Sequence, residues 1–202
     1  MPIRLPFKKL NQWQQIVFGC ALLERMLPNY KMFVEAAEFG DAKLLRNQLD
    51  TVWQWLDKSQ KVKINYEAQL TKLDEQTPDP EQFDFFGVFP ALDACMALTS
   101  LLQGISTNDN EELANVGRLS ENSVSYFVEL TLAQEMEETA TDDDDMTIEP
   151  AHIKTHPLMQ WEIATQNELF DFLKDAPESK ATCQQAKAMV LEEGLSNLGI
   201  EI

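Results

Sequence analysis

The stretch FDFFGVFPALDACMALTSLL, at residues 83–102, is the most apolar part of the chain and decides the fold. Pro90 suits the first turn of a helix, and residues 91–102 after it carry a single charge, Asp93. A helix with so little polar surface is buried on every side in a globular protein. We therefore predict a buried central helix over residues 91–102, with the other helices packed around it.

The segments on either side show apolar residues at the three- and four-residue steps that are typical of amphipathic helices. Pro28 stops or restarts the first of these helices, and Gly117 and Ser120 mark a possible break in the longest one. After Gly194 the chain ends in a short tail, residues 196–202. The other predicted helices cover residues 9–27, 28–39, 42–56, 65–73, 109–138, 158–172 and 177–194.

Strands are not expected. No segment alternates apolar and polar residues with β-branched enrichment, and no period of 30 to 45 residues indicates a helical repeat. Only seven glycines occur, and no Gly/Ser-rich linker divides the chain. We predict an all-α fold: a compact multi-helix bundle of about seven or eight helices, as one domain over residues 1–202, with an acidic loop at 139–150.

The formal charge of −18 lies in one part of the chain. Residues 73–153 hold 19 Asp and Glu and one base, Arg118, which leaves 15 acids and 15 bases elsewhere. A surface this negative repels phosphate backbones and anionic lipid heads and attracts cations or basic proteins. We expect no nucleic acid and no membrane among the partners, which leaves a homodimer or a basic protein.

The N-terminal part of the chain does not resemble a membrane span or a signal peptide. The run Ile16–Leu23 is free of polar residues for about eight positions, far below the roughly 20 that a span needs.

Three cysteines, Cys20, Cys95 and Cys183, lie far apart in apolar stretches and lack the paired spacing of zinc or redox sites. We interpret them as reduced core residues and predict a cytoplasmic protein.

Glu149, His152 and His156 form the first group with metal-binding chemistry, since carboxylate and imidazole groups bind divalent cations. Pro150 and Pro157 disfavour one continuous ligand helix, however, and di-iron bundles need two Glu-x-x-His units where this chain has one. We interpret the group as part of a solvated acidic loop and assign no metal site and no cofactor.

A second acidic group is Glu135 with Glu138, followed by Asp142 with Asp145. It is similar to the paired acidic motifs of all-α nucleotide pyrophosphohydrolases, which hold magnesium between two facing helices. Here only three residues separate the two pairs, so they cannot stand on separate facing helices. A solvated helix end is the better interpretation.

Asp93 is the single charge of the most buried helix, and a buried carboxylate can mark a catalytic site. It also lies in the first turn after Pro90, where the helix dipole favours a negative group, with Arg25, Arg46 or Arg118 as a partner. We favour this structural role. The chain has no phosphate loop, nucleophile elbow or His-Glu-x-x-His motif, so its catalytic residues stay unknown.

Aromatic residues are interpreted as core rather than as a ligand platform, because aromatics at helical spacing usually pack inside. No base occurs between Lys72 and Arg118, so the stacking-plus-cation arrangement of single-stranded nucleic acid binding is missing there. The residues concerned are Phe83, Phe85, Phe86, Phe89, Trp13, Trp53, Trp55 and Trp161.

Two functional hypotheses follow. Leu44 and Trp55 project roughly 80 to 100° from the apolar stripe of helix 42–56, which predicts a contact surface and a non-enzymatic protein-interaction module. The alternative is a metal-dependent enzyme that acts on a small substrate with Glu135, Glu138 and Asp93.

Five stretches of the chain resemble the YjaG-like family of small bacterial proteins, a domain of unknown function. They are LPNY at 27–30, LLRNQLDTVWQWL at 44–56, FGVFPALDA at 86–94, HPLMQWEIATQ at 156–166 and EEGLSNLGI at 192–200. The resemblance implies an all-helical, cytoplasmic, single-domain protein with no assigned activity and no catalytic residues to carry over.

Overall fold

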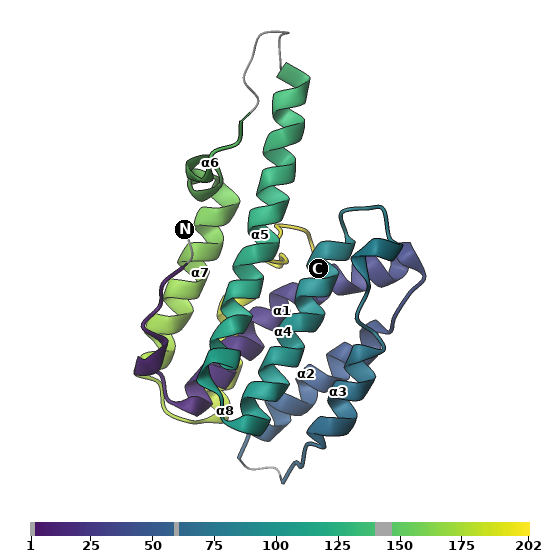
Figure 1. The fold of residues 1–202 in the computed structure, drawn as a ribbon. Helices are drawn as coiled ribbons and strands as arrows, with labels where there is room; N and C mark the ends of the chain where they lie inside the picture. Colours follow the sequence, from purple (N-terminus) through teal and green to yellow (C-terminus); the bar gives the residue numbers. More distant parts are fainter. Residues whose placement is uncertain (1–2, 59–60, 140–146) are drawn as a thin grey trace.

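The computed structural model describes residues 3–58, 61–139 and 147–202, and over these residues it contains eight α-helices and no β-strand (Figure 1). The predicted all-α bundle is confirmed. The helices are α1 (Gln12–Ala37), α2 (Ala42–Leu56), α3 (Tyr66–Asp74), α4 (Val88–Thr107), α5 (Asn110–Thr139), α6 (Pro150–Thr155), α7 (Pro157–Lys174) and α8 (Lys180–Val190).

Helix α4 is the predicted buried helix, and it packs against α1, α3 and α5. One stripe of α4 nevertheless faces solvent, at the seven-residue spacing of Phe89, Met96 and Gln103. The prediction that this helix is buried on every side was therefore wrong. By length and composition alone, α4 could also cross a membrane. Because 72% of its membrane-length window is buried inside the bundle, α4 has the surroundings of a core helix.

Helix α1 shares the central position with α4, since it packs against α2, α4, α5, α7 and α8. It runs without interruption through Pro28, so the predicted break there was wrong. Pro28 cannot donate the backbone hydrogen bond to Glu24 that a helix interior requires. Burial of Leu27, Asn29 and Tyr30 on either side of the proline outweighs that loss.

Helix α5 is also continuous, so the predicted break at Gly117 and Ser120 was wrong. A Cβ atom at Gly117 would lie 3.0 Å from Oε1 of Gln166, so the glycine permits close approach of α5 and α7. Figure 1 shows the last turns of α5 extending beyond the other helices. Of the predicted acidic loop at 139–150, residues 140–146 lie outside the described residues.

The C-terminal segment is part of the core and does not trail from the last helix as predicted. Ser196 and Asn197 are fully buried, and the backbone N–H of Asn197 donates to the carbonyl of Arg25 at 3.1 Å. The segment is held in a turn by an isolated bridge between Leu195 and Glu201. Its polar residues concealed this role, because burial of polar groups depends on partners that lie far away in the sequence.

Candidate functional site

Exposed apolar side chains gather where α1, the start of α4 and the middle of α5 meet. Met32 is 46% exposed, Phe89 44% and Tyr126 50%. The rings of Phe89 and Tyr126 stack at 6.2 Å between centroids. They adjoin a cavity of about 250 Å³, the aromatic groove, which is lined by Asn29, Met32, Phe33, Ala36, Phe85, Phe86, Gly87, Pro90, Phe127, Leu198 and Ile200.

The turn before α4 builds one wall of the aromatic groove. Phe85 stacks on Phe33 with centroids 5.7 Å apart, and Phe86 packs against Phe127, also with centroids 5.7 Å apart. A Cβ atom at Gly87 would lie 2.9 Å from the Phe85 ring, so a larger residue at this position would displace that ring. The interpretation of all these phenylalanines as core was wrong for Phe85 and Phe89, which are exposed. Exposed aromatic surface of this kind often marks a contact site.

The chain segments that border the aromatic groove are acidic in sequence. The segments 83–90, 122–134 and 195–202, which border it, contain Asp84, Glu129 and Glu201 and no lysine or arginine. On the α1 side, Lys31 lies 4.0 Å from Glu35, so that base is already beside an acid. The groove therefore combines apolar walls with a surplus of negative charge.

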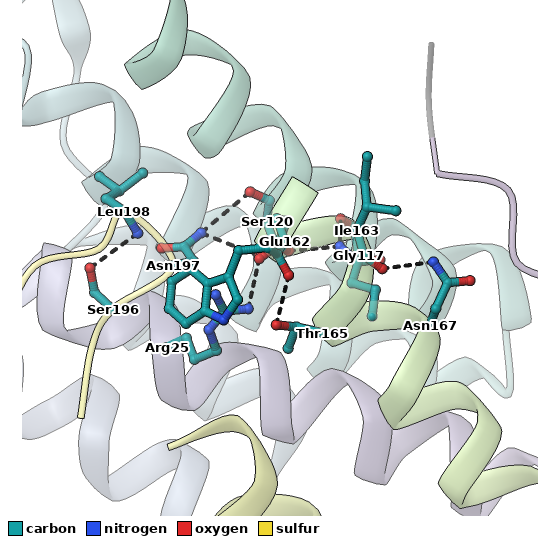
Figure 2. A network of polar contacts seen from close by, with 12 residues as sticks. Arg25, Gly117, Ser120, Glu162, Ile163, Thr165, Asn167, Ser196, Asn197 and Leu198 are labelled. Atoms are coloured by element: carbon teal, nitrogen blue, oxygen red, sulfur yellow. Dashed lines mark hydrogen bonds and ion pairs between the residues drawn. The ribbon is translucent and has the colours of Figure 1, made fainter. Parts of the chain in front are cut away.

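A buried polar network lies beneath this face, and its side chains come from α1, α5, α7 and the C-terminal segment. Figure 2 shows Arg25 and Glu162 pointing toward one another, with Ser120 and Asn197 beside them. Nη1 of Arg25 lies 2.7 Å from Oε2 of Glu162, and both side chains are fully buried. The Arg25 guanidinium also lies 4.1 Å from the ring centroid of Trp161.

Both carboxylate oxygens of Glu162 accept hydrogen bonds inside the protein. Oε1 accepts from Oγ of Ser120 at 2.7 Å and from Nε2 of Gln166 at 2.8 Å. The Glu162 carboxylate is therefore fully engaged in contacts that join three helices, while Nε and Nη2 of Arg25 have no hydrogen-bond partner among the described residues. Helical periodicity does not identify Glu162 and Gln166 as inner residues, because both are polar and interrupt the apolar pattern of α7.

Asp93 lies on the inner side of α4 and bonds to α5. Its carboxylate accepts from Oγ of Ser123 at 2.8 Å and from Nδ2 of Asn122 at 3.2 Å. Desolvation by burial outweighs these hydrogen bonds and raises the pKa of Asp93 to about 6. The predicted arginine partners lie elsewhere: Arg25 pairs with Glu162, Arg46 with Glu24 and Asp50, and Arg118 with Glu111.

The structure does not bring the proposed catalytic carboxylates together. Glu135 follows Ser123, the partner of Asp93, by 12 residues along α5, which corresponds to about 18 Å. Glu138 lies farther along the same helix. Asp142 and Asp145 lie outside the described residues.

The two histidines cap helices. Nδ1 of His152 accepts from the backbone N–H of Glu149 at 3.3 Å in α6, and Nδ1 of His156 accepts from the N–H of Leu158 at the start of α7. Within residues 3–58, 61–139 and 147–202, no group of three or more His, Cys, Asp and Glu side chains is arranged to hold a metal ion.

Leu44 and Trp55, the predicted contact surface, are half-buried and pack against the core. They are too little exposed to indicate an interface, whereas the side chains around the aromatic groove are exposed enough to do so.

The three cysteines are buried, and burial raises the pKa of the Cys95 thiol to about 12 and that of the Cys183 thiol to about 11. Such thiols stay protonated and unreactive at neutral pH.

Comparison with known proteins covers nearly the whole chain. A sequence model of the family described as "Protein of unknown function (DUF416)" matches residues 2–201. The uncharacterized protein YjaG of Salmonella typhimurium is 35% identical over 200 residues, which span 98% of this chain and 96% of that protein. YjaG of Escherichia coli is 33% identical over the same shares.

One solved structure extends this similarity to three dimensions. The crystal structure of a DUF416 family protein from Shewanella baltica superposes with a TM-score of 0.80 at 32% identity. It covers 98% of this chain and 100% of the crystallised one. The similarity thus includes the order and packing of the helices as well as the sequence.

Proposed function

Because this chain belongs to the DUF416 family, whose description names no activity, we propose a function from its own surface: it is a non-enzymatic protein-interaction module of the cytoplasm that docks a partner on the aromatic groove. The observation that supports this proposal is the exposure of Met32, Phe89 and Tyr126 around one apolar cavity. Contiguous apolar patches of this kind are uncommon on proteins that have no partner.

The partner is a segment with apolar side chains on one face and lysine or arginine on the other. Apolar residues fill the groove, while the bases are attracted to the acids of the bordering segments, Asp84, Glu129 and Glu201. A second copy of this chain would place acids opposite acids, which is unfavourable at short range. Charge complementarity therefore favours a basic partner over a homodimer.

Fluorescence anisotropy with two labelled amphipathic peptides tests the proposal. Both peptides carry leucine on one face, and the other face is lysine in one peptide and glutamate in the other. We expect only the lysine peptide to bind, with an affinity that falls as salt increases. The double substitution Met32→Ser, Phe85→Ser removes two exposed side chains that line the groove and should weaken binding by about tenfold or more.

Met96→Ser is the matched control, because Met96 is 43% exposed on α4 and does not line the groove. Its binding should equal that of the parent protein. Equal binding of the two peptides, or no effect of the double substitution, would overturn the proposal. A dimer detected by sedimentation that the double substitution abolishes would make a second copy the occupant.

The metal-dependent enzyme remains the alternative hypothesis, but no observation favours it. Its three carboxylates, Asp93, Glu135 and Glu138, are spread along α4 and α5 instead of converging. A thermal-shift screen with magnesium, manganese, zinc and calcium is its direct test, because a specifically bound ion raises the apparent stability.

A further inference from the structure

A cavity of about 400 Å³, the N-terminal cavity, shares no lining residue with the aromatic groove. It is lined within residues 3–7, by Phe18 of α1, by one face of α5 between residues 114 and 121, and by Gln166 of α7. The backbone N–H of Ile3 donates to Oε2 of Glu121 at 2.9 Å, and Phe7 packs edge-to-face on Phe18 with centroids 5.4 Å apart. These contacts hold the N-terminal segment as one wall of a cavity whose size is typical of small-molecule sites.

The carboxamide of Gln166 has a fixed orientation in this cavity. Nε2 of Gln166 donates to the backbone carbonyl of Gly117 at 3.0 Å and to Oε1 of Glu162 at 2.8 Å. Because a backbone carbonyl can only accept, the nitrogen is the end that faces it, and the other end is the oxygen. A Cβ atom at Gly117 would lie 3.0 Å from this oxygen, so the absence of a side chain at Gly117 leaves Oε1 uncovered on that side.

Oε1 of Gln166 is an unpaired acceptor that remains accessible. Within the described residues no group donates to it, yet it is not among the unpaired side-chain atoms that are closed to solvent, such as Oε1 of Gln15 and Oε1 of Gln48. The Gln166 side chain is 2% exposed and lines the N-terminal cavity, so its accessible surface opens there. A ligand group that donates to Oε1 forms its hydrogen bond where little water competes.

The lining of the cavity is positively charged, in contrast to the chain as a whole. It includes two bases, Arg4 and Arg118, and one acid, Glu121. Arg4 is exposed and forms no ion pair with the described residues, while the pair between Arg118 and Glu111 is exposed and 3.7 Å long. The two arginines therefore attract an anion. Because the net charge of −18 repels a doubly charged phosphate more than a single carboxylate, the carboxylate is favoured.

We propose that the N-terminal cavity binds a small carboxylate that has an apolar body and a hydrogen-bond donor at the end opposite the carboxylate. The donor bonds to Oε1 of Gln166, the apolar body lies against Phe7 and Phe18, and the carboxylate pairs with Arg4 and Arg118. This site is independent of partner docking on the aromatic groove, because the two cavities have no residue in common.

Three probes that differ at one end test the proposal by isothermal titration calorimetry. 4-Hydroxyphenylacetate carries both the donor and the carboxylate, 4-methylphenylacetate keeps the shape without the donor, and 4-hydroxyphenylacetamide keeps the donor without the charge. We expect 4-hydroxyphenylacetate to bind about fivefold to tenfold more tightly than either of the others. Its binding should also shift the backbone amide resonances of Gly117 and Ala114 in NMR spectra.

Two substitutions that remove the same charge test the anion contact. Arg4→Gln should weaken binding of 4-hydroxyphenylacetate by about threefold and leave binding of the carboxamide unchanged. Lys8→Gln is the matched control, because Lys8 is exposed in the same segment and does not line the cavity. It should bind all three probes as the parent protein does. With Gln166→Met, the hydroxyl and methyl probes should bind equally.

Equal affinity of the hydroxyl and methyl probes for the parent protein would overturn the contact with Gln166 and with it the proposal. The same loss with Lys8→Gln as with Arg4→Gln would show attraction by overall charge instead of a site. Absence of binding by 4-hydroxyphenylacetate at millimolar concentration would also overturn the proposal. If Gln166→Met does not fold, the comparison of the two probes on the parent protein decides alone. None of these results bears on the aromatic groove, which the peptide experiment tests separately.

Discussion

Asp93 is a carboxyl group whose protonation is linked to folding. Its pKa is about 6 in the folded protein, because burial disfavours the charged form, and about 3.9 in an unfolded chain. Between these two pH values the folded state keeps a proton that the unfolded state has lost. The contribution of Asp93 to stability is therefore fully present below about pH 4 and is lost as the pH rises through 6.

Asp93→Asn should remove this dependence, since asparagine does not titrate and its Oδ1 can still accept from Ser123. We expect the free energy of unfolding of the variant, relative to that of the parent protein, to increase by up to about 3 kcal/mol from pH 4 to pH 7. Urea denaturation of both proteins at several pH values measures this difference. A difference that stays constant across the range would contradict the raised pKa.

Glu162 is the second residue whose charge matters, because it is the partner of the fully buried Arg25. Glu162→Gln leaves the guanidinium without a counter-charge, and we expect a loss of roughly 3 to 5 kcal/mol in the free energy of unfolding. Glu193 is an exposed acid, so Glu193→Gln is the control and should change the free energy of unfolding by less than about 0.5 kcal/mol. Similar values for the two variants would show that the ion pair is dispensable.

At the scale of elements, the helices were predicted well where packing and local signals agree. Asp41 and Asn65 cap α2 and α3 close to the predicted starts at residues 42 and 65, and Leu45, Leu49 and Val52 form the buried stripe of α2. The predictions failed at α1 and α5, where proline and glycine lie inside long helices. Both failures have one cause: neighbouring helices stabilise a continuous helix more than the local signal disfavours it.

Pro28→Ala tests the balance within α1. Alanine restores the backbone donor toward Glu24, so we expect the variant to gain about 1 to 3 kcal/mol in the free energy of unfolding, measured by urea denaturation. A loss of stability would mean that the proline sets a bend on which the packing of α1 depends.

The C-terminal segment contributes to the core although its sequence predicts only a tail. Asn197→Ala removes the partner of Asn29 and one donor to Ser120, and we expect it to cost roughly 2 to 4 kcal/mol. Ile202→Ala, at a side chain that is 55% exposed, is the control and should have little effect. A small effect at Asn197 would indicate that water replaces its hydrogen bonds.

For the whole molecule, the uneven charge has a measurable consequence. Residues 73–153 carry the whole net charge of −18, so the acids in this part of the chain repel one another. Raising sodium chloride from about 10 to 150 mM shortens the Debye length from roughly 30 to 8 Å. We expect the free energy of unfolding to rise over this range, and a decrease would show that attractive ion pairs dominate instead.

The amino-acid pattern by itself determined that this protein is an all-α bundle with α4 buried and that it belongs with the YjaG-like proteins. Those properties depend on residue spacing and on composition, which are local. Only the tertiary structure decided that Arg25, Ser120, Glu162 and Asn197 meet, and that Phe85 and Phe89 face solvent beside Tyr126. Contacts between residues that are distant in the chain depend on how the helices pack. The periodicity of one helix shows which of its faces is apolar, but not which other helix packs against that face.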